Sequence, residues 1–480
     1  MQPLQVDHQA PSVPAATARL SGKKRVVPIS GMRSAVMKSV HIEDIAQLQV
    51  PLQGSEDSVQ TVHKKRALVA AIIGNALEWY DFIVYGFLAV FIAKQFFPPG
   101  DDAAALLLTF ATFALSFVVR PLGGVLIGLY ADRFGRRPAL SFIMASMTVS
   151  MLIMVFVPSY ASIGVTATVL MVIARILQAL SAGGEFASAA TYLLESIPAK
   201  KRGLYSGLYS SGPLLATVMA ALVGLLMTQV MTPESRDSWG WRVPFAFGLL
   251  IAPVGYYIRR YLPESEAFEK NVGDRGTMEM LRIVFREHRR ALMVALSLAA
   301  IGTSVQYVLL VYAPTYAVRE LKLPANVPFL ALLVCGAIGT VLTPLLGMVA
   351  DRLGAKRQLH ISLAALIVMI VPLYVWMTSG PTTAKFIICS AIFTTVTSAS
   401  NAVYPKLMAY LFPPELRSTG MAISYNLSAT IFGGFSLYAI TVMLNAVQSP
   451  LVPAFYVVAV TAVFWIFLVV LHRPGSDFKV

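Results

Sequence analysis

The chain has 480 residues, of which 57% are hydrophobic and only 13% are charged, and its formal net charge at pH 7 is +14. A water-soluble globule of this length cannot bury so much apolar surface, so the composition excludes a soluble protein. It predicts a chain embedded in a lipid bilayer.

The first 65 residues contain no long apolar run. They are rich in Ala, Ser, Pro, Gln and basic residues, and they lack the apolar core of a cleavable signal peptide. Such a composition is typical of disordered segments. We therefore expect residues 1–65 to form a disordered cytoplasmic tail, in which Met32 and Met37 are alternative start sites.

Twelve apolar stretches follow this tail, and each is long enough to cross ~30 Å of hydrocarbon at ~1.5 Å per residue. They cover roughly residues 68–92, 104–130, 139–157, 165–194, 204–227, 243–261, 291–318, 327–349, 359–377, 384–411, 420–444 and 451–471. Each stretch is predicted to be one transmembrane helix.

The domain boundaries follow from these stretches. We expect one bundle of six helices at residues 66–262 and a second at residues 290–472. A cytoplasmic linker at residues 263–289 separates them, and residues 278–290 are predicted to form a short amphipathic helix on the membrane surface. Residues 473–480 are expected to be a cytoplasmic tail.

The Lys and Arg residues of the loops are distributed unevenly between the two sides of the membrane. One side carries eighteen of them and the other side six. By the positive-inside rule the richer side is cytoplasmic, and both termini lie there too. Orientation and lipid contact therefore account for the positive charge, and we expect no nucleic-acid partner.

Sequence motifs for other chemistry are missing. The chain has no phosphate-binding loop, no dinucleotide motif and no cluster with metal-ligand spacing, so we expect no cofactor, no metal and no enzymatic activity. The two cysteines, Cys335 and Cys389, fall in different predicted helices, and no disulfide is expected between them.

One loop motif occurs twice. Residues 128–137 (GLYADRFGRR) are echoed 219 residues later by residues 347–357 (GMVADRLGAKR), each time between the second and third predicted helix of a half. The shared pattern G-x-x-x-D-R-x-G, followed in both copies by basic residues, resembles the signature loop of the major facilitator superfamily. The resemblance implies an all-α membrane protein with twelve transmembrane helices in two pseudo-symmetric six-helix bundles, which moves solutes by alternating access.

Charges in these loops are candidates for a gate, because Asp and Arg can pair across helix ends in one conformation and separate in the other. The alternative is that they only set the orientation of the chain. Glu195 precedes Arg202 by seven residues, whereas the same offset from Arg417 gives Tyr410, so we expect a stronger charge network in the first half. The predicted gating residues are Asp132, Arg133, Arg136, Glu195, Arg202, Asp351 and Arg352.

Three acidic residues are candidates for carrying a proton. Glu78 and Asp81 in the first helix lie on one face at i, i+3 spacing, ~15–20 Å into the bilayer. Glu185 in the fourth helix should lie closer to the cytoplasm. Carboxylates at such depth are costly unless they are paired, protonated or hydrated, so they are functional candidates. The alternative is a static ion pair with a neighbouring Arg.

Two arginines lie at mid-depth, Arg120 in the second helix and Arg175 in the fourth. A guanidinium there needs a carboxylate, which either the protein or the substrate can supply. We expect both to bind the substrate. Lys406 lies near a helix end, from which its amine can reach the membrane surface, so we expect it to have a structural role rather than to bind the substrate.

Polar residues at similar depth are candidates for substrate recognition, with ordinary interhelical hydrogen bonds as the alternative. In the first half they are Asn75, Tyr85 and Gln178; in the second half Gln306, Tyr307 and Asn401, with Thr303, Ser304, Tyr312, Tyr404 and Asn426 as further members.

Several longer strings narrow the resemblance. They are G-N-x-L-E-W-Y-D-F-x-x-Y-G from Gly74, R-P-L-G-G from Arg120, R-x-L-Q-x-x-S-x-G-G-E from Arg175 and W-G-W-R-x-P-F from Trp239. As a set over about residues 66–472 they resemble the metabolite:proton symporters, which carry citrate and other di- and tricarboxylates, α-ketoglutarate, shikimate, or proline and betaine. Ala179 and Ala355 depart from the usual pattern without removing an ionisable group from the expected cavity.

The two arginines favour an anionic substrate. We expect a monomeric symporter in a bacterial cytoplasmic (inner) membrane that imports protons with a small organic anion, such as citrate or α-ketoglutarate. One alternative is symport of a zwitterion such as proline or betaine. A drug:proton antiporter is less favoured, because Gly212-Pro213 matches only a fragment of the antiporter pattern.

Overall fold

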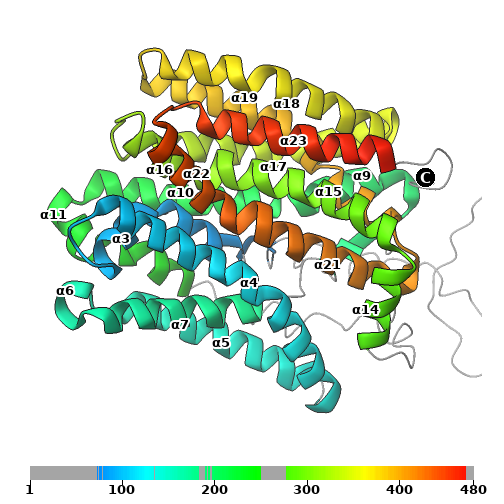
Figure 1. Cartoon of the computed structure of the whole chain (residues 1–480), viewed down its shortest axis with the longest axis horizontal. Helices are drawn as coiled ribbons and strands as arrows, with labels where there is room; N and C mark the ends of the chain where they lie inside the picture. Colours follow the sequence, from blue (N-terminus) through cyan, green and yellow to red (C-terminus); the bar gives the residue numbers. More distant parts are fainter. Residues whose placement is uncertain are drawn as a thin grey trace, which may run out of the picture. The chain divides into compact units, whose positions relative to one another are not determined.

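The computed structural model describes residues 73–471, except residues 74, 78, 135, 183–186, 188–189, 192, 195–196 and 250–276. It describes the backbone but not the side chains of residues 125, 128, 129, 131–134, 136–141, 143, 144, 277 and 278. The predicted tails and residues 263–276 of the predicted linker lie outside the described residues. All the secondary structure that is described is helical (Figure 1).

The first half of the chain begins with a helix over residues 75–87 that is described apart from residue 78. The elements after it are α3 (Ala89–Phe96), α4 (Asp102–Phe134), α5 (Arg136–Phe156), α6 (Tyr160–Ile163), α7 (Val165–Ser181), η1 (Ala199–Lys201), α9 (Arg202–Ser210), α10 (Gly212–Val230), α11 (Pro233–Ser235) and η2 (Arg236–Gly240). A further helical segment covers residues 242–249.

The second half begins with a short linker helix, α14 (Thr277–Arg286). Its other elements are α15 (Arg289–Gln306), η3 (Tyr307–Val311), α16 (Ala313–Arg319), α17 (Val327–Leu353), α18 (Ala355–Thr378), α19 (Thr383–Asn401), α20 (Tyr404–Tyr410), η4 (Pro414–Leu416), α21 (Arg417–Ser428), η5 (Ala429–Gly434), α22 (Phe435–Val447) and α23 (Val452–Leu471). The elements η3 and η5 are π-helical turns inside longer spans.

The described helices match the predicted spans closely. Eight are long and apolar enough to cross a membrane, or nine if residues 75–87 and α3 form one bent span. Two shorter apolar helices, Ala145–Phe156 and Val165–Ser181, correspond to the third and fourth predicted spans. The sixth predicted span, residues 243–261, lies mostly outside the described residues.

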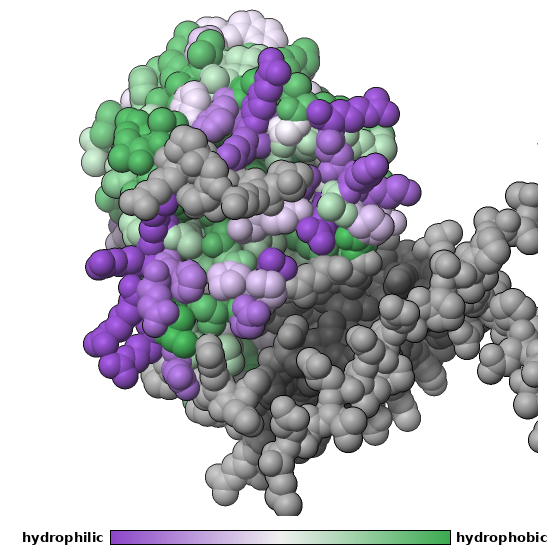
Figure 2. Space-filling model, turned by 90° about the vertical axis from the view of Figure 1, so that its right-hand side faces the viewer, coloured by the Kyte–Doolittle hydropathy of each residue, from purple (hydrophilic) through white to green (hydrophobic). Residues whose placement is uncertain are grey.

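Large apolar side chains cover much of the outer surface. Phe156, Val230, Val368 and Val470 are each exposed over more than 70% of their area, as side chains that contact lipid would be. Figure 2 looks onto the right-hand end of Figure 1 and shows hydrophilic side chains between areas of hydrophobic surface. We call this the basic end, because Arg289, Arg352 and Arg417 begin or end their helices there.

Hydropathy alone does not reveal where the predicted spans are interrupted. The span at 204–227 breaks at Ser211, between α9 and α10, and the span at 384–411 breaks between α19 and α20. Pro213 and Pro405 stand just after these breaks, and a proline has no backbone N–H to donate. Both breaks border the pocket described below.

The closest approach between the two halves runs along α9, α10 and α17. A Cβ atom on Gly203 would lie 2.4 Å from the carbonyl oxygen of Gly347, and one on Gly207 would lie 2.6 Å from that of Thr343. Only glycine allows the two backbones to approach this closely. The glycines therefore determine how tightly the halves pack at the basic end.

Candidate functional site

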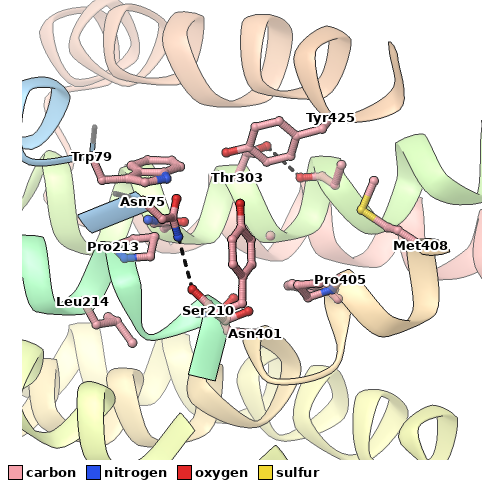
Figure 3. A pocket seen from close by; sticks show the side chains of 15 residues that line it. Asn75, Trp79, Ser210, Pro213, Leu214, Thr303, Asn401, Pro405, Met408 and Tyr425 are labelled. Atoms are coloured by element: carbon pink, nitrogen blue, oxygen red, sulfur yellow. Dashed lines mark hydrogen bonds between the residues drawn. The ribbon is translucent and has the colours of Figure 1, made fainter. Parts of the chain in front are cut away.

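A pocket lies between the two halves of the chain. Its lining residues are Asn75, Trp79, Tyr209, Ser210, Pro213, Leu214, Ala299, Gly302, Thr303, Gln306, Asn401, Tyr404, Pro405, Met408 and Tyr425. They come from the first helix, α9 and α10 in the first half, and from α15, α19, α20 and α21 in the second. In Figure 3, Trp79 and Asn75 lie across the pocket from Thr303 and Tyr425.

A missing hydrogen bond positions Asn75. In a regular helix the N–H of residue 213 would bond to the carbonyl of residue 209, but Pro213 has no N–H. The carbonyl of Tyr209 accepts a hydrogen bond from Asn75 Nδ2 instead, at 3.1 Å. The break between α9 and α10 therefore fixes a side chain of the first helix in the pocket wall, as Figure 3 shows.

The second-half wall depends on a small residue and a proline. Gly302 of α15 leaves space for the ring of Tyr404, since a Cβ at this position would lie 2.8 Å from that ring. Pro405 likewise leaves the backbone carbonyl of Asn401 without its usual helical donor. This wall thus places the ring of Tyr404 beside the hydrogen-bond acceptors of Asn401, which are its backbone carbonyl and its side-chain amide oxygen.

The chemistry of the pocket is aromatic and polar, without charge. The rings of Trp79, Tyr209, Tyr404 and Tyr425 contribute to its lining. Among the described lining residues none is charged. Pockets with apolar walls and a few polar groups are typical sites for small molecules.

Arg175 lies in an aromatic cluster outside this lining. Its side chain is fully buried, and its guanidinium carbon lies 4.2 Å from the ring centroid of Tyr85 and 5.1 Å from that of Phe82. Nη1 donates a hydrogen bond to Gln178 Oε1. Within the described residues, Nε and Nη2 of Arg175 have no hydrogen-bond partner.

Asp81 and Arg120 complete this cluster. Asp81 is buried, and it interacts electrostatically with Arg175 and with the side chain of Gln178. Arg120 is also buried, and its guanidinium carbon lies 4.4 Å from the centroid of Phe82. The cluster therefore combines a carboxylate, an amide and two guanidinium groups inside the membrane-spanning part of the chain, where charge is costly without such partners.

Tyr307 connects the pocket with this cluster. Its ring centroid lies 6.1 Å from that of the pocket residue Trp79 and 5.3 Å from that of Phe117. Gly433 leaves room for the ring, because a Cβ there would lie 3.0 Å from it. Tyr307 also interacts electrostatically with Arg175. A change of charge in the cluster can thus affect the pocket through the rings of Tyr307 and Trp79.

The structure separates the predicted substrate residues into two groups. Asn75, Gln306 and Asn401 line the pocket, together with Thr303 and Tyr404. Arg120, Arg175, Tyr85, Gln178 and Tyr307 belong to the aromatic cluster instead. Of the three predicted proton carriers, Asp81 lies in this cluster, whereas Glu78 and Glu185 lie outside the described residues.

Sequence reasoning missed several residues of the pocket. Trp79 could have been found, because it follows Asn75 by four residues and therefore shares its helix face. Tyr209, Ser210 and Met408 gave no comparable signal. They reach the pocket because α9 ends and α20 begins beside it, and hydropathy does not show where a helix is interrupted.

A model of the Major Facilitator Superfamily matches residues 71–437 of the chain. The chain belongs to the major facilitator superfamily. It is therefore a multi-pass membrane transporter, and the repeated loop motif marks the two halves of a facilitator.

Curated relatives place this facilitator among the metabolite:proton symporters. A putative proline/betaine transporter of Staphylococcus aureus (strain COL) is 32% identical over 421 residues, 86% of this chain and 90% of the relative. A citrate-proton symporter of Salmonella typhi is 32% identical over 371 residues, 77% of this chain and 85% of the relative. A proline/betaine transporter of Escherichia coli (strain K12) is 29% identical over 412 residues, 83% and 81% of the two chains.

Solved facilitator structures share the fold. A crystal structure of a D-xylose-proton symporter superposes with a TM-score of 0.68 at 18% identity, over 84% of this chain and 97% of that one. A partially occluded, inward-open structure of the xylose transporter XylE from E. coli gives 0.65 at 18% identity, over 85% and 98%. This likeness concerns the fold alone.

At the basic end of this facilitator, Asp351 joins the two halves. Its carboxylate accepts hydrogen bonds from the backbone N–H groups of Gly203, at 2.7 Å, and Leu204, at 3.0 Å. These groups lie in the first turn of α9, where backbone N–H groups have no partner within the helix and favour a negative charge. The second copy of the loop motif therefore caps a helix of the first half.

The amine of Lys406 does not reach the membrane surface. Its side chain is only 3% exposed, and its Nζ lies 3.0 Å from Asp351 Oδ1. The backbone N–H of Lys406 also donates to Ser206 Oγ at 3.3 Å. Asp351 lies near the end of α17, and α20 supplies the buried cation that pairs with its carboxylate.

The other predicted gating residues divide into three groups. Arg202 donates a hydrogen bond to the hydroxyl of Tyr410 at 2.9 Å, so it too joins the halves. Arg352 is exposed. Asp132, Arg133 and Arg136 have no described side chains, and Glu195 lies outside the described residues. The expected difference in strength between the two charge networks thus stays a prediction.

At the middle of α4, the halves meet through the carbonyl of Phe117. Pro121 cannot donate the helical hydrogen bond to it, and Thr430 Oγ1 of η5, which also bonds to the Asn426 carbonyl at 2.8 Å, donates one at 2.7 Å instead. Nearby, a Cβ on Gly434 would lie 2.8 Å from the ring of Phe117. The halves are therefore in contact at the middle of α4 as well as at the basic end.

We expect Thr430→Val to lower the initial rate of substrate uptake by about fivefold. The change keeps the shape of the side chain but leaves the Phe117 carbonyl without a donor, which costs ~1 kcal/mol. Uptake into proteoliposomes measures the effect. Thr395→Val is the matched control, because the Thr395 hydroxyl is exposed and bonds only to Ala391 of its own helix. Equal rates for both variants would contradict a role for the contact.

Proposed function

We propose that this facilitator is a proton-coupled symporter for a small zwitterion that carries a substituted ammonium group, such as betaine or proline. The observation that carries the proposal is the pocket, in which four aromatic residues surround a space whose described lining has no charge. A net-neutral solute suits such a site, because no protein charge has to be compensated.

The aromatic lining supports the ammonium end of the substrate. A quaternary ammonium over the face of Trp or Tyr is attracted by the ring quadrupole, by ~0.5–2 kcal/mol. Trp79 and Tyr425 lie on different sides of the pocket and would enclose such a group (Figure 3). The amide groups of Asn75, Gln306 and Asn401 would donate hydrogen bonds to the carboxylate end.

The aromatic cluster would couple transport to protons. Asp81 is our candidate carrier, because it is a buried carboxylate whose neighbours Arg175 and Gln178 are themselves connected to the pocket through Tyr307. Glu78 and Glu185 remain candidates from the sequence. In an alternating cycle, the contacts at Asp351 would open and close the basic end, which we assign to the cytoplasm on the basis of its loop charges.

A second candidate substrate is a small organic anion, as first expected from the sequence. The observation that favours it is Arg175, whose Nε and Nη2 have no hydrogen-bond partner among the described residues and could bind a carboxylate. This candidate requires the substrate to pass the aromatic layer at Trp79 and Tyr307. The relatives named for proline/betaine and for citrate support one candidate each.

Uptake into proteoliposomes separates the two candidates. Labelled betaine, proline, citrate and α-ketoglutarate would be offered with and without an inward proton gradient, and each would be tested as a competitor of the others. We expect gradient-driven accumulation of betaine or proline that excess citrate does not inhibit. Accumulation of citrate that betaine does not inhibit would instead show that the substrate is an organic anion. Accumulation that is the same with and without the proton gradient would contradict proton symport for either substrate.

A further inference from the structure

The linker helix α14 presents two different faces. Val284 is fully buried, and Met280 packs against the second half, where its sulfur accepts a hydrogen bond from Thr419 Oγ1 at 4.0 Å. The opposite face exposes Arg282, Arg286 and 52% of Phe285. One face thus packs against α15 and α21, and the other face is exposed at the basic end.

The exposed face is close in sequence to a contact with the end of an apolar helix. Arg290, four residues after α14 ends, donates a hydrogen bond to the carbonyl of Leu471, the last residue of the apolar helix α23. Phe285 lies less than two turns before Arg290. A half-exposed aromatic ring between arginines is typical of helices that lie in the membrane interface.

The charge of this face is predominantly positive. Arg282 and Arg286 are one helical turn apart, and Arg289 begins α15 directly after the turn; Glu279 and Glu287 are the exposed acidic residues nearby. Within the described residues, none of the three arginines forms an ion pair with a carboxylate.

We propose that Arg282, Arg286 and Arg289 bind the headgroup of an anionic phospholipid while Phe285 inserts among the acyl chains, so that α14 is a lipid-binding element of the linker. Arginine suits this partner, because its planar guanidinium binds phosphate through two hydrogen bonds. Each basic residue near an anionic membrane surface contributes ~1 kcal/mol, which corresponds to about fivefold in affinity. The proposal does not depend on which substrate is carried.

A fluorescent reporter on α14 tests the proposal in the full-length protein. Every variant would carry Glu279→Cys labelled with a small fluorophore; Cys335 and Cys389 are buried and should stay unlabelled. Brominated phosphatidylglycerol and brominated phosphatidylcholine would be compared as quenchers in bilayers of otherwise equal composition. We expect at least about fivefold preference for phosphatidylglycerol.

Two sets of substitutions define the site. Replacing Arg282, Arg286 and Arg289 by Gln should remove the preference, whereas Lys200→Gln, Lys201→Gln and Arg357→Gln should keep it, since they remove as much charge from exposed positions elsewhere at the same end. Phe285→Ser should weaken quenching by both lipids. Continued protection of Cys335 and Cys389 from thiol reagents would show that each variant is folded. Equal quenching by both lipids before substitution, or equal losses in both triple variants, would overturn the proposal.

Discussion

Lys406→Met is expected to reduce the initial rate of substrate uptake by at least about tenfold. The substitution preserves most of the side-chain volume but leaves the carboxylate of Asp351 without the cation that lies 3.0 Å away. Removing one partner of a buried ion pair costs ~3–5 kcal/mol. That cost falls on the conformation in which the basic end is closed, so the transporter should shift towards conformations in which this end is open.

A double variant distinguishes lost closure from general damage. Asp351→Asn combined with Lys406→Met removes both charges, and the new amide oxygen can still accept a hydrogen bond from α9. We expect the double variant to transport faster than Lys406→Met alone, because no uncompensated charge remains. If the double variant is as slow as the single one, the ion pair is not what limits transport.

The conformational shift can be observed directly. Ser210 lines the pocket, and a cysteine at this position should react faster with a membrane-impermeant maleimide added at the basic end when Lys406 is replaced. Lys385→Met is the matched control, because Lys385 is partly exposed at the other end of the molecule, where it contacts nearby carbonyl oxygens and the ring of Trp376. It should change neither uptake nor labelling.

The fold could be predicted from the sequence because its signals are local or repeated. Apolar length predicts a membrane span without any knowledge of its neighbours. The twofold loop motif related residues 128–137 to residues 347–357, and with them the two halves. Loop charge then favoured one orientation. None of these steps depends on knowing which side chains meet.

The candidate site could be predicted only in part, because its composition depends on contacts between side chains of different helices. Asn75 was identifiable as a polar residue at mid-depth, but its bond to Tyr209 depends on Pro213, more than a hundred residues away. Arg175 was a candidate because of its position along the helix, yet this position does not say whether a side chain faces the pocket or the interior of its own half. For Lys406, distance from a helix end suggested the surface, whereas the partner that keeps it buried belongs to another helix.

The prediction with the most direct bearing on substrate class concerns Trp79. If an ammonium group lies against its ring, Trp79→Ala should raise KM for betaine by up to about thirtyfold, since the cation–π attraction is worth ~0.5–2 kcal/mol. Trp79→Phe, which retains an aromatic face, should raise it less. Trp376→Ala is the control, because Trp376 is 41% exposed on α18 and is not part of the pocket.

The same variants give a different pattern if the substrate is an organic anion. A carboxylate bound by Arg175 gains nothing from the face of an aromatic ring, which is negative. Trp79→Ala would then leave KM for citrate nearly unchanged, while Arg175→Lys would raise it, because lysine cannot form the paired hydrogen bonds of a guanidinium. Measuring KM for both substrates in both variants therefore locates the bound charge, either at the pocket rings or at the arginine behind them.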